Sequence, residues 1–244
     1  CPYDMGGYFI VNGTEKVVIS QDRIAENKTY VFINNKEPAY SFIGEIRSVQ
    51  ENRFSVPKTT TLKLSNKPNQ FGRYIRVNIH HVKYDVPLFI LFRAFGIESD
   101  RAIIEYIVHD VHDDNNQDIM KELVGSVEEA NNVLNKREAM EFLLKHLNIN
   151  GYPREYLGNK VKRMEILTNV LKNECLPHVG PDFHKKALYL GYMTRKLLEC
   201  YTKKRPLDER DSYINKRVDT PGILMANLTR QYYGKVIKEM RNMI

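Results

Sequence analysis

The sequence predicts an α+β fold in which a strand-rich first third precedes a mainly helical remainder. The first 85 residues contain short runs rich in aromatic and β-branched residues, and turn-forming residues separate these runs. From Val86 onward the apolar residues recur with the 3.6-residue period of a helix. The sequence shows no internal repeat and no low-complexity tract.

The expected strands begin with a hairpin. Residues 8–11 and 17–20 flank Asn12-Gly13, a dipeptide that supplies the positive φ angles of a tight turn. Asparagine and proline residues separate four further runs with strand character. These runs cover residues 29–33, 40–49, 59–64 and 74–80. In the last of them apolar residues alternate with polar ones, as expected of a strand with one buried face.

Five helices are expected after the strands. The first follows Ser99 or Asp100 as its N-cap and ends near residue 109, and the second is closed by Asn150-Gly151. Residues 156–171 and 183–201 form longer helical patterns. Thr220-Pro221 begins a last helix that runs to the end of the chain, because proline suits a first helical turn. The first two helices have the apolar stripes Ala102, Ile103, Tyr106 and Ile107, and Ala139, Phe142, Leu143 and Leu147.

The composition is that of a folded protein with a basic surface. The 244 residues are 42% hydrophobic and 27% charged, which excludes a disordered chain. Lysine and arginine number 37 against 30 acidic residues, so the net charge is +7. This excess favours a polyanionic partner but does not distinguish nucleic acid from an acidic protein. The longest apolar run, residues 86–92, is too short to span a bilayer, and we expect no membrane partner.

The cysteines are few and widely separated. Cys1, Cys175 and Cys200 include no C-x-x-C pair, so they predict neither a disulfide framework nor a cysteine zinc site. A reducing compartment is the natural interpretation. Because the chain begins with Cys1 rather than methionine, we expect it to be a piece of a longer protein.

One cluster of residues invites a catalytic interpretation. A metal-dependent phosphohydrolase uses histidine and carboxylate ligands, the residue types found at His109, His112 and Asp113. Such a site needs ligands that converge from separate elements, however, and local density alone does not make one. We therefore favour a polar helix end followed by a loop, and we keep the independent hydrolase as an alternative.

The other histidines and the known motifs indicate no chemistry. His80-His81 closes a predicted strand, where alternation would point the two rings to opposite faces and prevent them from binding one ion. His178 and His184 flank a turn and are expected to be structural. G-x-S-x-G, H-E-x-x-H and phosphate-binding G-x-x-x-x-G-K motifs are absent. We therefore predict no catalytic residue, no metal site and no cofactor within this chain.

Six sequence blocks resemble those of a known protein family. The family is the second-largest subunit of multisubunit DNA-dependent RNA polymerases, of the eukaryotic, archaeal or viral type. The blocks keep the family's order over the whole chain. They are residues 1–17 (CPYDMGGYFIVNGTEKV), 20–27, 85–97 (with FRAFGI), 176–178 (LPH), 190–198 (LGYM and KLL) and 208–222 (with DERD and NKRVD).

The resemblance implies a domain arrangement and a place in the enzyme. Residues 1–24 correspond to the end of the protrusion, 25–219 to the lobe, and 220–244 to a helix that returns toward the protrusion. These parts line one side of the DNA cleft, over the downstream DNA and the RNA–DNA hybrid. Lys16 matches a lysine that faces nucleic acid, and Arg23 follows on the same segment. For Arg23 an ion pair in domain packing is nearly as well supported.

A second set of charged residues is expected to have a structural role rather than to bind nucleic acid. Acids and bases are interleaved in this segment, which favours an internal salt-bridge network. The set consists of Asp208, Arg210, Asp211, Lys216, Arg217 and Asp219.

The resemblance also implies the function, the partners and the location. The holoenzyme is a nucleotidyltransferase of transcription, with Mg and Zn held elsewhere, and this chain is non-catalytic. Its expected partners are the largest and other polymerase subunits, DNA, the RNA–DNA hybrid and initiation factors. A pure protein-interaction module is the third interpretation. The nucleus is expected, or the virion or cytoplasmic viral factory, since the many Asn, Lys, Ile and Tyr residues suit an AT-rich viral genome.

Overall fold

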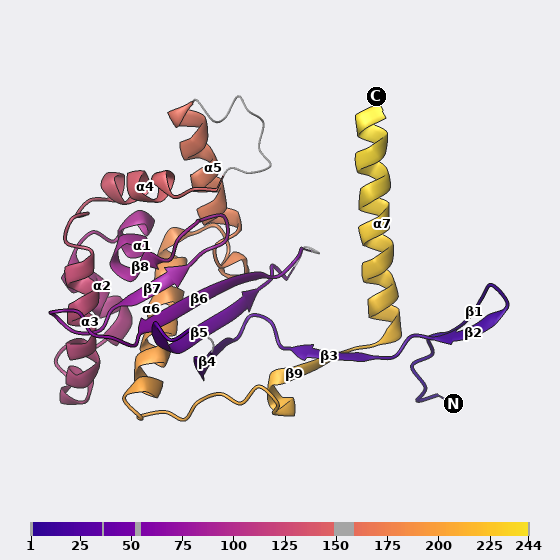
Figure 1. Ribbon diagram of the computed structural model, residues 1–244, viewed down its shortest axis with the longest axis horizontal. Coiled ribbons are helices and arrows are strands. Elements are labelled where there is room, and N and C mark those ends of the chain that lie inside the picture. Colours follow the sequence, from indigo (N-terminus) through magenta and orange to yellow (C-terminus); the bar gives the residue numbers. More distant parts are fainter. Residues whose placement is uncertain (1, 36, 52–54, 149–158, 244) are drawn as a thin grey trace. The chain divides into compact units, whose positions relative to one another are not determined.

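The chain forms two compact units, each with its own secondary structure. The computed structural model describes residues 2–35, 37–51, 55–148 and 159–243 (Figure 1). Antiparallel strands come first and helices follow, which confirms the predicted α+β class. The central unit comprises Glu26–Asp208, and the terminal unit combines Cys1–Ala25 with Glu209–Ile244.

The central unit is built on a sheet with the strand order β4-β5-β6-β7-β8. Each strand pairs antiparallel with its neighbour, and Gly44 lies opposite both Val31 and Leu62. Leu62, Leu64 and Val77 are completely buried, as the alternating pattern predicts for one face. The strands are β4 (Thr29–Ile33), β5 (Tyr40–Ser48), β6 (Lys58–Ser65), β7 (Ile75–Asn78) and β8 (Val86–Pro87).

Helices complete the core of this unit. The short helix α1 is buried along its whole length and lies against β7 and β8. The long helix α6 lies across β4, β5 and β6, where Gly44 lets Leu197 approach the sheet (Figure 1). The helices are α1 (Leu88–Phe95), α2 (Asp100–Val108), α3 (Gln117–Glu129), α4 (Lys136–Lys145), α5 (Lys160–Asn173) and α6 (Phe183–Tyr201).

Some predicted boundaries in the central unit are wrong. The strand expected to reach residue 80 ends at Asn78, because the chain turns there and the Val82 amide donates to the Ile79 carbonyl oxygen at 3.2 Å. The polar stretch expected as a loop contains a short 3-10 helix (Asp114–Asn116) and then α3, which buries Ile119 and Leu123. The predicted closure at residues 150–151 and the predicted helix start at 156–158 lie outside the described residues.

The terminal unit begins with the predicted hairpin. Asn12 and Gly13 have φ angles of 52° and 73°, which confirms the turn. Since this turn has two residues, β1 (Tyr8–Val11) is followed at once by β2 (Thr14–Val17), and the strand expected at 17–20 is wrong. An unexpected second pair joins β3 (Gln21–Ile24) to β9 (Lys216–Asp219), after a 3-10 helix at Tyr213–Asn215.

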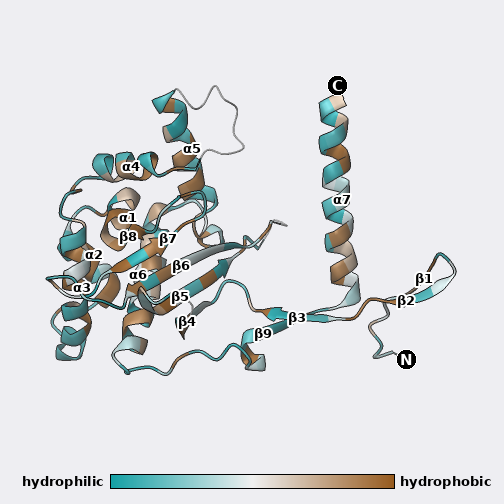
Figure 2. Ribbon diagram, viewed as in Figure 1, coloured by the Kyte–Doolittle hydropathy of each residue, from teal (hydrophilic) through white to brown (hydrophobic). Residues whose placement is uncertain are grey.

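Helix α7 (Pro221–Met243) ends the terminal unit and begins at the predicted proline. The Leu224 amide closes its first turn on the Thr220 carbonyl oxygen at 3.1 Å. Figure 2 shows hydrophobic and hydrophilic residues mixed along the helix, and Pro221 is its one buried residue in the described range. None of the described helices is both long and apolar enough to cross a membrane.

Candidate nucleic-acid interface

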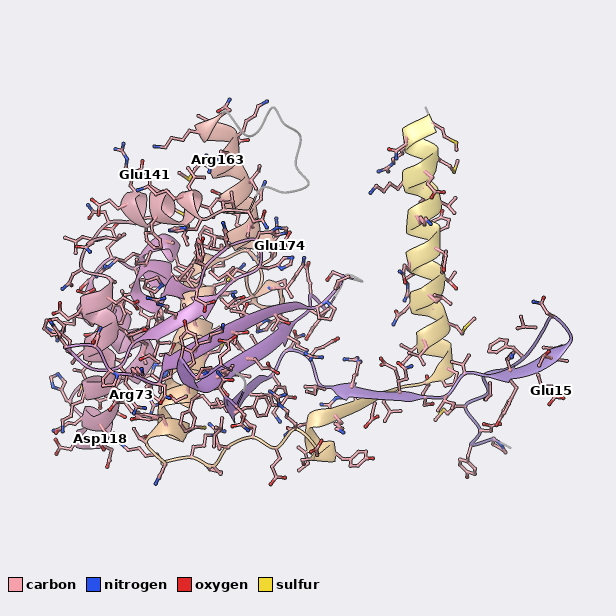
Figure 3. All side chains as sticks on the ribbon, in the orientation of Figure 1. Glu15, Arg73, Asp118, Glu141, Arg163 and Glu174 are labelled. Atoms are coloured by element: carbon pink, nitrogen blue, oxygen red, sulfur yellow. The ribbon has the colours of Figure 1, made fainter. Side chains whose placement is uncertain are left out.

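Lys16 lies on the exposed hairpin of the terminal unit. It pairs with Phe9 across the two strands, and every described residue of β1 and β2 is exposed. The neighbouring Glu15, labelled in Figure 3, pairs with Ile10 and projects from the opposite face, because successive side chains of a strand alternate. No ion pair joins Lys16 to another described residue of the chain. Its ammonium is therefore available to an external anion.

One face of the β3–β9 pair carries two arginines. Arg23 lies directly opposite Arg217, and Gln21 lies opposite Asp219. Arg23 Nε donates to both carboxylate oxygens of Asp219, at 3.0 and 2.9 Å, so this ion pair runs diagonally across the ribbon. Arg217 donates to the carbonyl oxygens of Ile214 and of Lys216, at 3.4 and 2.7 Å. The face thus combines two guanidinium groups with one carboxylate.

The opposite face of this ribbon carries a second diagonal pair. Lys216 Nζ lies 3.3 Å from the carboxylate of Asp22 and 4.0 Å from that of Asp211, which is fully exposed. Arg210 is exposed. Ion pairs this accessible contribute little to stability. Within the predicted salt-bridge network of residues 208–219, the structure places Lys216 near Asp211. Asp219 instead pairs with Arg23, which lies outside that network.

Asp208 belongs to the central unit and pairs with a lysine that the sequence reasoning missed. Lys196 Nζ, on α6, lies 2.7 Å from Asp208 Oδ2 and donates to the Thr29 carbonyl oxygen at 2.6 Å. The same carboxylate oxygen accepts from the Val31 amide at 2.9 Å. Lys196 is only 3% exposed. Its position on the apolar stripe of α6, beside Met193 and Leu197, was the signal that could have identified it.

Other residues of the resembling blocks are also structural. Arg93 is 1% exposed; it donates to the carbonyl oxygens of Ala130, at 2.7 Å, and of Val133, and it forms an ion pair with Asp100. Gly191 lies so close to α2 that a Cβ atom would stand 2.2 Å from the Tyr106 carbonyl oxygen. These residues hold helices together and face no described cavity.

His178 and Lys186 are perturbed by burial. Burial, and secondly the nearby Lys186 cation, lowers the pKa of His178 to about 4. The Ser48 hydroxyl lies 2.7 Å from His178 Nδ1, and His178 Nε2 is buried with no hydrogen-bond partner among the described residues. Burial also lowers the pKa of Lys186 to about 8, while carbonyl oxygens of residues 171, 172 and 175 accept from its ammonium. Lys186 is buried and His178 is half-buried, and both make their described polar contacts within the central unit.

The candidate hydrolase cluster is not assembled. His109, His112 and Asp113 do not converge within the described residues; instead Asp113 accepts from the Asn115 amide at 3.0 Å and so caps a turn. His184, expected to be structural, lies 2.5 Å from the Tyr106 hydroxyl through its Nδ1 atom.

The prediction that His80 and His81 face opposite sides is wrong. The strand ends before them, and His81 takes a φ of 64°, so strand alternation no longer applies. Their ring centroids lie 4.3 Å apart at an interplanar angle of 63°. Together with Glu174 they form the only group of three potential metal ligands that converge in the described parts of the chain.

Comparison with known proteins identifies the family. The family model described as RNA polymerase Rpb2, domain 2, matches residues 25–219. Over its full length the chain is 37% identical to DNA-directed RNA polymerase II subunit 2 of Arabidopsis thaliana, and over 97% of its length it is 39% identical to subunit RPB2 of Encephalitozoon cuniculi. It is 31% identical, over 98% of its length, to DNA-directed RNA polymerase subunit 2 of Acanthamoeba polyphaga mimivirus.

The chain spans only part of these relatives. It covers 20% of the length of the Arabidopsis and Encephalitozoon proteins and 21% of the mimivirus protein. The family model nevertheless covers most of the chain, and the similarity to relatives extends over nearly all of it. The chain therefore belongs to the family of the second-largest subunit of multisubunit DNA-directed RNA polymerases.

Proposed function

We propose that this chain is a non-catalytic part of a multisubunit DNA-directed RNA polymerase and lines its DNA cleft. The single observation that carries this contact is the exposed ammonium of Lys16 on the β1–β2 hairpin, which forms no ion pair with another described residue. Nucleotidyl transfer belongs to the assembled enzyme, whose Mg and Zn ions lie in other parts. The family membership of the chain supports this role.

The proposed domain assignment follows the family. We assign residues 1–24 to the end of the protrusion, 25–219 to the lobe and 220–244 to a helix returning toward the protrusion. The span of the family model, residues 25–219, supports the lobe assignment. By contacts alone, residues 209–219 group with the terminal unit, because β9 pairs with β3.

The contact with nucleic acid would be electrostatic. Lys16 would neutralise a backbone phosphate of the downstream DNA or of the RNA–DNA hybrid, which carries no sequence information and suits a translocating enzyme. Arg23 is the second proposed contact. The Asp219 carboxylate accepts a hydrogen bond from Arg23 Nε. Arg217, directly opposite Arg23, adds positive charge to the same face of the β3–β9 pair.

Exposed apolar residues support protein partners for the terminal unit. Tyr232, Tyr233 and Met240 of α7 are 61%, 67% and 57% exposed, and Ile10 of the hairpin is 78% exposed. Such surfaces favour burial against other protein. The proposed partners are the largest and other polymerase subunits and initiation factors. The proposed location is the nucleus, or the virion or viral factory if the source is a virus, as for the mimivirus relative.

The test is a Lys16→Glu substitution in the full-length subunit, assembled into the polymerase. The measured quantity is the salt dependence of DNA binding. Loss of one phosphate contact should lower the slope of log K against log salt by about 1 and weaken binding uniformly across DNA sequences. Lys185→Glu, an equal charge reversal at an exposed position of α6, is the matched control and should leave the slope unchanged. An unchanged slope for Lys16→Glu would contradict the proposed contact.

A further inference from the structure

Three side chains from distant parts of the central unit converge on one point. His80 and His81 follow β7, and Glu174 follows α5, at the position labelled in Figure 3. Glu174 Oε2 lies 3.2 Å from His81 Nε2 and 3.8 Å from His80 Nε2. One ligand atom from each residue lies within 4.8 Å of the other two.

The backbone holds both sides of this cluster in place. The positive φ of His81 brings its ring beside that of His80, and its carbonyl oxygen accepts from the Asn148 amide at 2.8 Å. On the other side, the Glu174 amide donates to the Val170 carbonyl oxygen at 2.9 Å and so continues the bonding of α5. Binding an ion would therefore require little ordering of the chain, which favours affinity.

The carboxylate of Glu174 lacks a well-directed donor. Its Oε2 atom is buried and has no hydrogen bond within the described residues. Lys58 Nζ lies 3.0 Å away, close enough for an ion pair but not aligned as a hydrogen bond, and the Lys58 side chain is 27% exposed. A buried carboxylate oxygen without a hydrogen bond is costly, and the Lys58 ammonium beside it offsets only part of this cost. Lys58 can release it by turning toward solvent.

The ligand types indicate which cation would bind. Two imidazole nitrogens and one carboxylate oxygen suit a borderline transition metal, whereas Mg²⁺ and Ca²⁺ prefer sets made only of oxygen. Ligands about 2.0–2.1 Å from a tetrahedral Zn²⁺ stand about 3.3–3.4 Å apart. The observed separations of 3.2 and 3.8 Å lie close to that value. The side chains of His80, His81 and Glu174 are 49%, 26% and 25% exposed, which gives an ion access from solvent.

We propose that His80, His81 and Glu174 form a binding site for Zn²⁺ or a similar transition metal ion, with water as the remaining ligand. The bound ion would connect the end of β7 to the end of α5, two segments far apart in the sequence. It would therefore stabilise the central unit, because an ion that binds only the folded state shifts the unfolding equilibrium. This site is independent of the proposed contacts with nucleic acid.

The test is Zn²⁺ binding by the full chain after treatment with a chelator. We expect one Zn²⁺ per chain at this site, measured by calorimetric titration, and a melting temperature that rises with Zn²⁺ but not with the same concentration of Mg²⁺. Glu174→Gln and His81→Asn should each weaken Zn²⁺ binding by about tenfold or more, since even indirect ligand support is worth about that much. Asparagine suits this position because it tolerates the left-handed backbone.

His109→Asn is the matched control. His109 has a φ of 65°, nearly that of His81, and the acidic Asp110 follows it in the sequence, but it does not belong to the converging group. Its substitution should leave Zn²⁺ binding unchanged. The proposal is overturned if the chain binds no Zn²⁺, or if Glu174→Gln and His81→Asn bind as tightly as the unsubstituted chain. Melting temperatures measured with chelator present show whether each variant still folds.

Discussion

The central and terminal units use charged side chains in opposite ways. In the central unit Arg93, Lys186 and Lys196 are at most 3% exposed, and each donates to specific carbonyl or carboxylate oxygens. In the terminal unit the hairpin is exposed throughout, and the ion pairs of the ribbon lie at its surface. The described charged residues that are buried in a core thus all belong to the central unit, whereas those of the terminal unit stay near its surface.

The largest expected effect comes from breaking a buried ion pair of the central unit. Lys196→Met would leave the Asp208 carboxylate without its cation and the Thr29 carbonyl oxygen without its donor. Removing one partner of a buried pair typically costs about 3–5 kcal/mol, because the remaining charge is not compensated. We expect a loss of this size in the free energy of unfolding of the full chain, measured by urea denaturation.

Lys185→Met is the control for this substitution. Lys185 is on the same helix but exposed, so the change should lie within about 0.5 kcal/mol of the unsubstituted chain. A loss of less than 1 kcal/mol for Lys196→Met, in contrast, would mean that the pair does not hold α6 against β4.

The next prediction compares an alanine substitution at one glycine of each unit. In Gly191→Ala the new methyl group would stand 2.2 Å from the Tyr106 carbonyl oxygen, so α6 and α2 would have to move apart. Overpacking of this kind costs about 1–3 kcal/mol. Gly234→Ala on α7 meets no atom within 4 Å and should instead stabilise the helix, by up to about 1 kcal/mol.

The two alanine variants can be compared by thermal unfolding and by helix content from circular dichroism. Gly191→Ala should melt at a lower temperature, whereas Gly234→Ala should keep or raise the helix signal. Equal responses of the two variants would show that helix packing in the central unit is less tight than described.

The smallest destabilising effect is a pH dependence of the central unit. The pKa of His178 is lowered to about 4 in the folded chain, against about 6.5 when unfolded, so the unfolded state binds the proton first. Stability from this residue is therefore complete above pH 6.5 and is lost as the pH falls toward 4. Allowing for its partial exposure, we expect a loss of about 1–2 kcal/mol.

The measurement is urea denaturation between pH 7 and pH 4.5, with His178→Gln as the reference. Other titrating groups act equally in both proteins, so the difference between the two curves isolates His178. If the free energy of unfolding fell equally with pH in both proteins, the acid sensitivity would come from residues other than His178.

Features specified by neighbouring residues could be predicted from the sequence, and those specified by distant partners could not. Asn12-Gly13 determines its own turn and Pro221 its own helix start, and both were confirmed. The β3–β9 pair was missed, because the register of two short strands depends on contacts such as Arg23 with Asp219, 196 residues apart. The partner of Asp208 was missed for the same reason.

The candidate sites show the same division. Lys16 was singled out because its block resembles a known family, and its exposure follows from the short hairpin. The convergence of His80 and His81 was not predicted, because it depends on where β7 ends and on the backbone angle of one residue. Glu174 carries no local signal at all, since only the folded chain brings it to the two histidines.

The place where the chain enters and leaves the central unit has a consequence for evolution and for engineering. The Asp208 amide donates to the Val31 carbonyl oxygen at 3.2 Å, so the last residue of this unit lies beside its first strand. A module whose two ends meet can be exchanged, enlarged or excised, with a short peptide to close the gap, while the flanking chain keeps its course. Lineages could therefore remodel this part of the subunit without disturbing the segments on either side.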